Sequence, residues 1–238
     1  MAKLHDEWKV LPHGPLRELA PGLLTVVGQI PMPLGNFPRR MTVVALPRSR
    51  TAIWSPIPLG EDEMARIEAL GAPAFLVIPN PSHRLDARPF RARYPKAKII
   101  TAPGAEKRVE EAVPIDATDA DLGKNAELIT VDGVGEMELA MLVRHEGGTS
   151  LITNDIIGHV RAPQGIGAWI MARLTGFGPR AQVPRVIKRM LVKDPKALAR
   201  QFRQWAEVDH LIRLIPSHGD IIDHPQGELV RLSSELDH

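Results

Sequence analysis

Short apolar runs alternate with amphipathic segments along the first half of the chain. Strand-like runs occupy residues 22–30, 41–46, 51–57, 74–78 and 98–101, and most are bounded by Pro or Gly. From Glu61 onward, Met64, Ile67 and Leu70 recur at the spacing of an amphipathic helix. Residues 84–94 predict a short helix interrupted near Pro89, and residues 105–112 predict another. This alternation predicts an α/β layer with buried strands.

The second half of the chain has a different order of elements. Three consecutive strands are expected at 127–131, 138–143 and 150–153, the last two joined by a hairpin turn at 145–148. Helices at 184–190 and 195–207 follow, and in the second Leu198, Phe202 and Trp205 share one face. A last buried strand is expected at 211–215. With no repeat or linker evident, we expect one domain over residues 1–238.

Composition narrows the chemistry that is open to this chain. The 238 residues include no cysteine, so any metal must be held by His, Asp, Glu or water. The formal charge of +2 and the 4% aromatic content disfavour a nucleic-acid partner. The first residues lack the apolar core of a secretory signal, and no run is long enough for a membrane helix. We therefore expect a cytoplasmic protein with no membrane partner.

Polar residues follow three of the predicted strands. They are the segments 80–86 (NPSHRLD), 153–155 (TND) and 217–220 (SHGD). Ligand sites in α/β folds form beyond the carboxyl ends of strands. If these segments converge, His83, Asp155 and His218 supply two imidazoles and a carboxylate for one divalent metal. The alternative is structural: an Asp after a strand often forms a turn or caps a helix, and a His there often bonds a loop carbonyl.

Several of these segments, between Leu16 and Asp223, resemble motifs of the metallo-β-lactamase superfamily. Residues 19–27 resemble its opening strand, and residues 41–46 and 51–60 resemble its next hairpin, with Ser55 near the usual Asp of a D-x-G turn. FLVIPNPSHRLD lies where the superfamily has H-x-H-x-D-H, SLITND resembles its L-x-T-G-D strand, and IPSHGD its final His-Gly. The resemblance implies an αβ/βα four-layer sandwich, with two mixed β-sheets flanked by helices.

The chain departs from the motifs of the superfamily's working hydrolases, whose several His and Asp ligands hold two metal ions. Here the first motif retains His83, and the His expected before the L-x-T-G-D strand is missing. Glu136 or Glu138 is a candidate substitute there, although exposed strand charges explain both. The resemblance therefore implies at most one ion (zinc, iron or manganese) held by His83, Asp155 and His218. The last two are also the candidate catalytic residues. Asn80, Asp86 and Asp220 are expected behind these ligands, with Asp86 or Asp220 orienting a histidine.

Three functional hypotheses remain open from the sequence. The first is a metal-dependent hydrolase that acts on a small-molecule ester, amide or phosphoester. The second is a binding or scaffold domain that keeps the fold without any metal or catalysis. The third is a metal-free acid–base enzyme that uses His83 and Asp155. We also expect His159 to be a surface residue. Trp169, Ile170, Met171 and Leu174 are expected to line a pocket or a homodimer contact.

Overall fold

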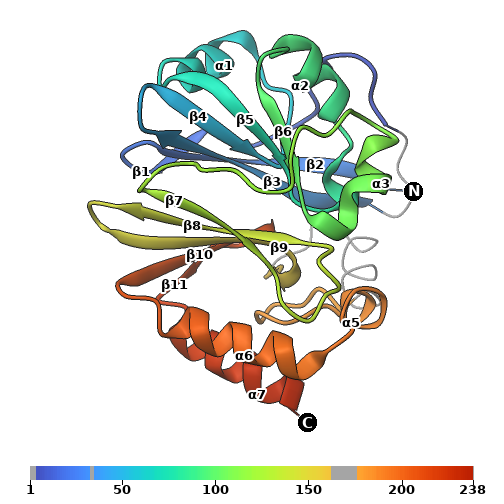
Figure 1. Cartoon of the computed structure of the whole chain (residues 1–238), viewed down its shortest axis with the longest axis vertical. Coiled ribbons are helices and arrows are strands. Elements are labelled where there is room, and N and C mark those ends of the chain that lie inside the picture. Colours follow the sequence, from blue (N-terminus) through green and yellow to red (C-terminus); the bar gives the residue numbers. More distant parts are fainter. Residues whose placement is uncertain (1–3, 33–34, 162–175, 238) are drawn as a thin grey trace.

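Two β-sheets face each other, and helices lie on both outer sides (Figure 1). The computed structural model describes residues 4–32, 35–161 and 176–237. Within these residues, the first sheet has the order β1-β2-β3-β4-β5-β6 and the second β11-β10-β9-β8-β7. Parallel and antiparallel pairs occur in both sheets. The predicted αβ/βα four-layer sandwich with two mixed sheets is thus confirmed.

The first sheet is formed by the first half of the chain. Its strands are β1 (Arg17–Ala20), β2 (Leu23–Met32), β3 (Gly35–Leu46), β4 (Arg50–Trp54), β5 (Ala72–Ile78) and β6 (Lys98–Thr101). Its helices are α1 (Glu61–Glu68), α2 (Ala87–Arg93) and α3 (Glu106–Glu110), with the short 3₁₀ turns η1 (Pro81–His83) and η2 (Pro103–Ala105).

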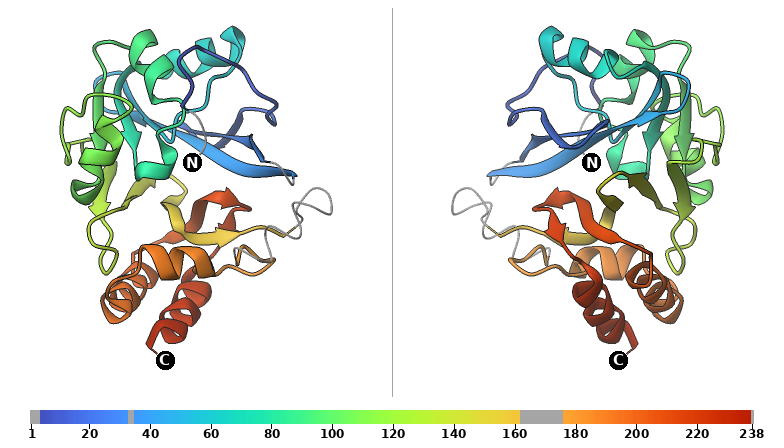
Figure 2. Two further views of the ribbon diagram at one scale, coloured as in Figure 1. Left: turned by 90° about the vertical axis from the view of Figure 1, so that its right-hand side faces the viewer. Right: turned by 90° about the vertical axis from the view of Figure 1, so that its left-hand side faces the viewer.

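The second sheet and its helices follow in the chain. The strands are β7 (Ala126–Thr130), β8 (Leu139–His145), β9 (Gly148–His159), β10 (Leu211–Gly219) and β11 (Ile222–Asp223). The helices α5 (Arg185–Met190), α6 (Pro195–Ala206) and α7 (Gln226–Asp237) lie on the far side of this sheet (Figure 2). Among the helices described, none is long and apolar enough to cross a membrane.

The side-chain alternation of β8 shows how the layers are held together. Leu139, Met141 and Val143 point into the core between the two sheets. Ala140 and Leu142 point the other way, into the core under α6 and α7. Because successive side chains of a strand point to opposite faces, an uninterrupted apolar run fits a strand that is buried on both sides.

Local sequence signals account for the start of α6 and for the position of the proline in α2. In α6, the Asp194 side chain accepts a hydrogen bond from the Ala197 amide at 3.0 Å, and Pro195 occupies the first turn. Its predicted apolar face is confirmed, since Leu198, Phe202 and Trp205 are all buried. The predicted interruption near Pro89 is wrong, because this proline lies in the first turn of α2, where its missing N–H costs nothing.

The strands of the second sheet run further than the sequence predicts. The predicted strand at 150–153 extends through residue 159, and the one at 211–215 extends through residue 219. As a result, Asp155 and His218 lie within strands rather than beyond them. Two of the three polar segments that look like loops in the sequence therefore lie in the second sheet.

Candidate metal centre

His83 is placed by a short turn directly after β5. Asn80 begins this turn, and its side-chain oxygen accepts a hydrogen bond from the Ser82 amide at 2.8 Å. Pro81 at the first position has the backbone angle that such a turn needs. His83 ends the turn with a buried side chain. Of the three candidate ligands, it alone follows a strand end as predicted.

Asp155 is placed by a bulge in β9. Thr153 pairs with Pro216 of β10, yet the next pair joins Gly158 to His218, so four residues of β9 face a single residue of β10. A bulge bends a strand and re-aims its side chains. Here it turns the Asp155 carboxylate toward the turn that carries His83.

His218 lies on β10 opposite this bulge. Its Nδ1 lies 2.7 Å from the carbonyl oxygen of Pro38 on β3, in the other sheet. A carbonyl can only accept, so Nδ1 carries a proton and donates it, and Nε2 faces the other way. The ring also packs against Phe37 and Phe177, with centroid separations of 4.7 and 5.7 Å.

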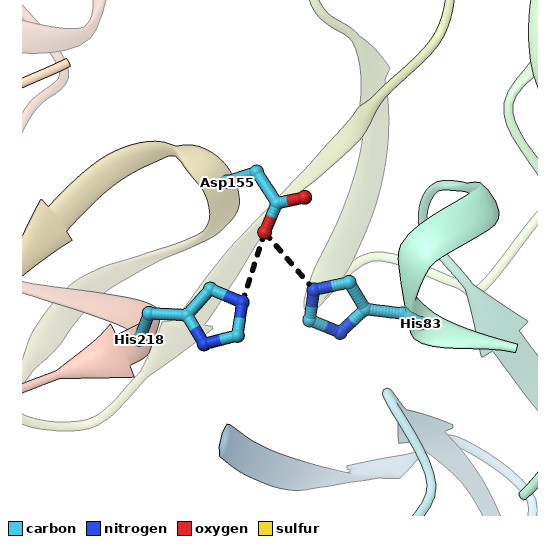
Figure 3. Close-up of side chains that lie close together, drawn as sticks. All are labelled: His83, Asp155 and His218. Atoms are coloured by element: carbon cyan, nitrogen blue, oxygen red, sulfur yellow. Dashed lines mark hydrogen bonds and ion pairs between the residues drawn. The ribbon is translucent and has the colours of Figure 1, made fainter. Parts of the chain in front are cut away.

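These three side chains meet at one point (Figure 3). Asp155 Oδ1 lies 3.2 Å from His83 Nε2 and 2.9 Å from His218 Nε2. One possible ligand atom from each residue lies within 4.8 Å of the others, and all three residues are buried. The structure thus brings together the three ligands that the sequence proposes, from segments more than 60 residues apart.

Burial and hydrogen bonding set the protonation of this group. Burial on its own raises the pKa of the Asp155 carboxyl, but hydrogen bonds from His218 and His83 outweigh it and hold that pKa well below its usual range. Burial also lowers the pKa of His83, although the neighbouring Asp155 opposes the shift. Asp155 is therefore ionised, and His83 favours its neutral form.

Each of the three candidate ligands has a second contact that fixes its orientation. Ser55 Oγ lies 2.5 Å from His83 Nδ1, and the Asn80 amide donates to Asp155 Oδ2 at 3.0 Å. The Pro38 carbonyl holds His218 as described above. Ser55 has a left-handed backbone with a φ of 53°, which is uncommon for a residue other than glycine and marks a constrained position.

Glu138 is a buried acid beside this group. It was expected to be an exposed strand charge if it was not a ligand, and the exposed interpretation is wrong, since its side chain is 0% exposed. Its two carboxyl oxygens accept hydrogen bonds from the Asn80 side chain at 3.1 Å and the Ile156 amide at 3.2 Å. Burial, together with the charge of Asp155, raises the pKa of Glu138 to about 8. Its position just before the doubly buried run of β8 is the one sequence signal that points to burial.

Two of the residues expected to support the ligands do other work. Asp86 is buried, but its oxygens engage Arg39 and His5, so the histidine it holds is not a candidate ligand. Asp220 is exposed, and its carboxylate accepts from the Arg161 amide at 3.3 Å rather than orienting His218.

His159 also departs from the expectation, since it is buried rather than at the surface. Its Nδ1 bonds the carbonyl of Asp220 at 3.1 Å. The predicted pocket-wall residues Trp169, Ile170, Met171 and Leu174 lie outside the described residues.

A cavity of about 240 Å³ opens beside the candidate ligands. Its apolar wall consists of Ile30, Phe37, Leu85, Phe177 and Ile187. Its polar lining consists of Arg39, Ser55, Ser82, His83, Asp155 and His218. A mostly apolar pocket with a few convergent polar groups is the usual form of a small-molecule site.

Comparison with solved structures places this architecture among known folds. No protein-family profile matches the sequence, and no curated protein matches it. The metallo-β-lactamase FIM-1 from Pseudomonas aeruginosa, in its mono-zinc form, matches with a TM-score of 0.64 and 12% identity over 95% of this chain and 97% of its own. The structure of VMB-1 matches with a TM-score of 0.63 and 13% identity, over 98% of this chain and 100% of its own. A metallo-β-lactamase from Pontibacter korlensis matches with a TM-score of 0.62 and 11% identity, over 92% of this chain and 98% of its own.

These matches span nearly the whole of each chain, and their low identity limits what they show to the fold. That fold agrees with the two mixed sheets and outer helices described above. It also agrees with the resemblance drawn from the sequence motifs. The chain therefore has the metallo-β-lactamase fold.

Proposed function

We propose that this chain is a metal-dependent hydrolase in which His83, Asp155 and His218 hold a single divalent cation. The observation that carries the proposal is the convergence of these side chains, each fixed from behind by a separate hydrogen bond. Metal ligands in proteins are generally oriented in this way by a second partner.

The donor set fits a cation on chemical grounds. With Nδ1 of His218 bonded to the Pro38 carbonyl, Nε2 is the atom directed at the ionised Asp155 oxygen, 2.9 Å away. Such a contact needs a positive charge between its two atoms, which a proton supplies in the metal-free chain and a cation would supply in its place. Atoms bound to one ion at about 2.1 Å lie within about 4.2 Å of each other. The two distances to Asp155 Oδ1 meet this limit, and all three candidate ligand atoms lie within 4.8 Å of one another, close to it.

Two imidazoles and one carboxylate suit zinc, iron or manganese. When bound, such an ion supplies a Lewis acid for a carbonyl or phosphoryl oxygen and lowers the pKa of a water molecule. The chain's own residues do the rest. Ser55, Asn80 and the Pro38 carbonyl hold the three ligands in place, and the apolar wall of the cavity excludes bulk water from the reacting group.

A single ion is favoured over two. Glu138 lies near the position where the superfamily has another histidine, and both of its oxygens are engaged by protein N–H groups. Asp86, in the first motif, is tied to Arg39 and His5. The FIM-1 structure in its mono-zinc form gives a precedent for one ion in this fold.

Metal analysis of purified, untagged protein tests the proposal. We expect about one equivalent of zinc, iron or manganese in the wild type and none in a His218→Ala variant. A His210→Ala variant is the control, because that side chain is exposed and does not belong to the group of candidate ligands. Hydrolysis of chromogenic ester and phosphoester substrates is expected to follow the metal content. Absence of metal, with stability unchanged in chelator, would favour the non-catalytic alternative.

A further inference from the structure

Arg39 is a buried cation on the wall of the cavity, and part of its hydrogen-bonding capacity is unused. Its side chain is 6% exposed. Nη1 donates to Asp86. Nε and Nη2 have no hydrogen-bond partner among the residues that the structure describes. Leaving a buried N–H group unpaired is energetically costly, so native proteins rarely keep one without a reason.

The free N–H groups have a particular geometry. Nε–H and one N–H of Nη2 lie along the same edge of the planar guanidinium group and donate in parallel. This arrangement matches the two oxygens of a carboxylate. The opposite side of the group is anchored by Asp86, which is itself held by His5 at 2.6 Å. The guanidinium is therefore oriented before any ligand arrives, which reduces the entropy cost of binding.

The strand next to Arg39 leaves space for this group. Gly28 of β2 pairs directly with Arg39 of β3, and a Cβ on that glycine would lie 3.9 Å from Arg39 Nε and 3.3 Å from Ile57. Phe37, two residues before Arg39 on the same face of β3, belongs to the apolar wall. Arg39 thus stands at the junction of the apolar wall and the candidate metal ligands.

We propose that the cavity binds a carboxylate with a short apolar body, with the carboxylate on the free fork of Arg39 and the body against Phe37 and Phe177. As a statement about substrate, this rests on the proposed hydrolase function, because the same cavity contains the three candidate ligands. As a statement about binding, it stands on Arg39 and the cavity alone.

Calorimetric titration of chelator-treated, metal-free protein with phenylacetate tests the proposal. The neutral isostere 2-phenylacetamide and the small anion acetate serve as comparison ligands. We expect phenylacetate to bind about 10- to 100-fold more tightly than the amide, since charge-assisted bonds to the fork are lost in the amide. Acetate is expected to bind more weakly than phenylacetate, because it cannot fill the apolar wall.

Variants assign the effect to Arg39. Arg39→Gln is expected to lower phenylacetate affinity to the level of the amide. Arg39→Lys keeps the ion pair with Asp86 and the fold, but a single ammonium cannot reproduce the fork, so an intermediate affinity is expected. Arg144→Gln, at an exposed arginine outside the cavity, is the control and is expected to bind as the wild type does.

The proposal is overturned if phenylacetate and its amide bind alike, if neither binds, or if both Arg39 variants bind phenylacetate as tightly as the wild type. The comparison of ligands needs no variant, so a misfolded Arg39→Gln protein does not remove the test. Metal content is measured separately. Protein that binds metal without carboxylate refutes this inference alone, and protein that binds carboxylate without metal refutes the hydrolase proposal alone.

Discussion

Replacing Glu138 with glutamine is expected to change how the stability of the metal-free protein depends on pH. In the folded chain, burial beside Asp155 raises the pKa of this carboxyl from 4.5 to about 8. In the unfolded chain the group ionises at its ordinary value. Between these two values the folded state binds the extra proton, so the free energy of unfolding falls as pH rises and levels off above about pH 8.

The size of the effect follows from the displacement of the pKa. Each unit corresponds to about 1.4 kcal/mol, so the full displacement corresponds to about 5 kcal/mol. A glutamine cannot ionise, and this part of the pH dependence disappears. Its amide can accept from only one of the two donors that now bond Glu138, which costs about 1 kcal/mol at all pH values. The two proteins are therefore expected to be about equally stable near pH 5, and Glu138→Gln is expected to be clearly more stable near pH 8.

The free energy of unfolding of both proteins is measured by urea unfolding at several pH values between about 5 and 8. The fluorescence of the buried Trp54 and Trp205 reports the unfolding. Glu127→Gln, at an exposed glutamate of β7 paired with Arg144, is the control and should run parallel to the wild type. Parallel curves for the wild type and Glu138→Gln would refute the reasoning, because they would show that Glu138 is ionised in both the folded and unfolded states.

Further predictions concern the ligands and the core. Ser55→Ala should weaken zinc binding about 10- to 100-fold in a calorimetric titration, because it frees His83, whereas Ser82→Ala, also in the cavity lining, should leave zinc affinity unchanged. Phe202→Ala should lower the free energy of unfolding in urea by about 3–5 kcal/mol, since this ring is fully buried under the second sheet. A loss below about 1 kcal/mol would show that α6 packs loosely there. Gly219→Ala should lower the midpoint of thermal unfolding, since a Cβ at its φ of +110° would lie 1.9 Å from a backbone oxygen of β9. An unchanged midpoint would show that β9 and β10 can move apart there at no cost.

Much of the fold was accessible from the sequence because its signals are local. Apolar runs bounded by Pro and Gly located β2, β5 and β6, and the spacing of Leu198, Phe202 and Trp205 located the buried face of α6. The C-terminal helix α7 was missed, although Leu229, Leu232 and Leu236 follow helical spacing. The strand extensions in the second sheet were missed because polar residues such as Asn154 and Ser217 look like loop residues when their partners are unknown.

The ligands of the candidate site were accessible for a different reason. His83, Asp155 and His218 match sequence motifs, so a resemblance could single them out without a structure. The groups that hold or surround them could not be found in this way. The Pro38 carbonyl has no sequence signature, and Glu138 and Arg39 look like ordinary surface charges on strands. Their burial arises only when the two sheets close on each other.

Asp86 and Asp220 show the converse problem. Both stand next to the motifs and are common residue types for orienting a histidine, which made them reasonable candidates. The Asp86 side chain instead bonds Arg39 and His5. The Asp220 side chain bonds the backbone amide of Arg161. Proximity in sequence does not determine the direction of a side chain once a strand or a turn has set its face.

Zinc K-edge X-ray absorption of zinc-loaded protein tests the central claim most directly. The account predicts one bound ion with two imidazole nitrogens and a carboxylate oxygen at about 2.0–2.2 Å, and loss of both imidazoles' scattering in a His83→Ala, His218→Ala double variant. A bound ion whose imidazole scattering persists in that double variant, or the absence of any tightly bound ion in the wild type, would contradict it.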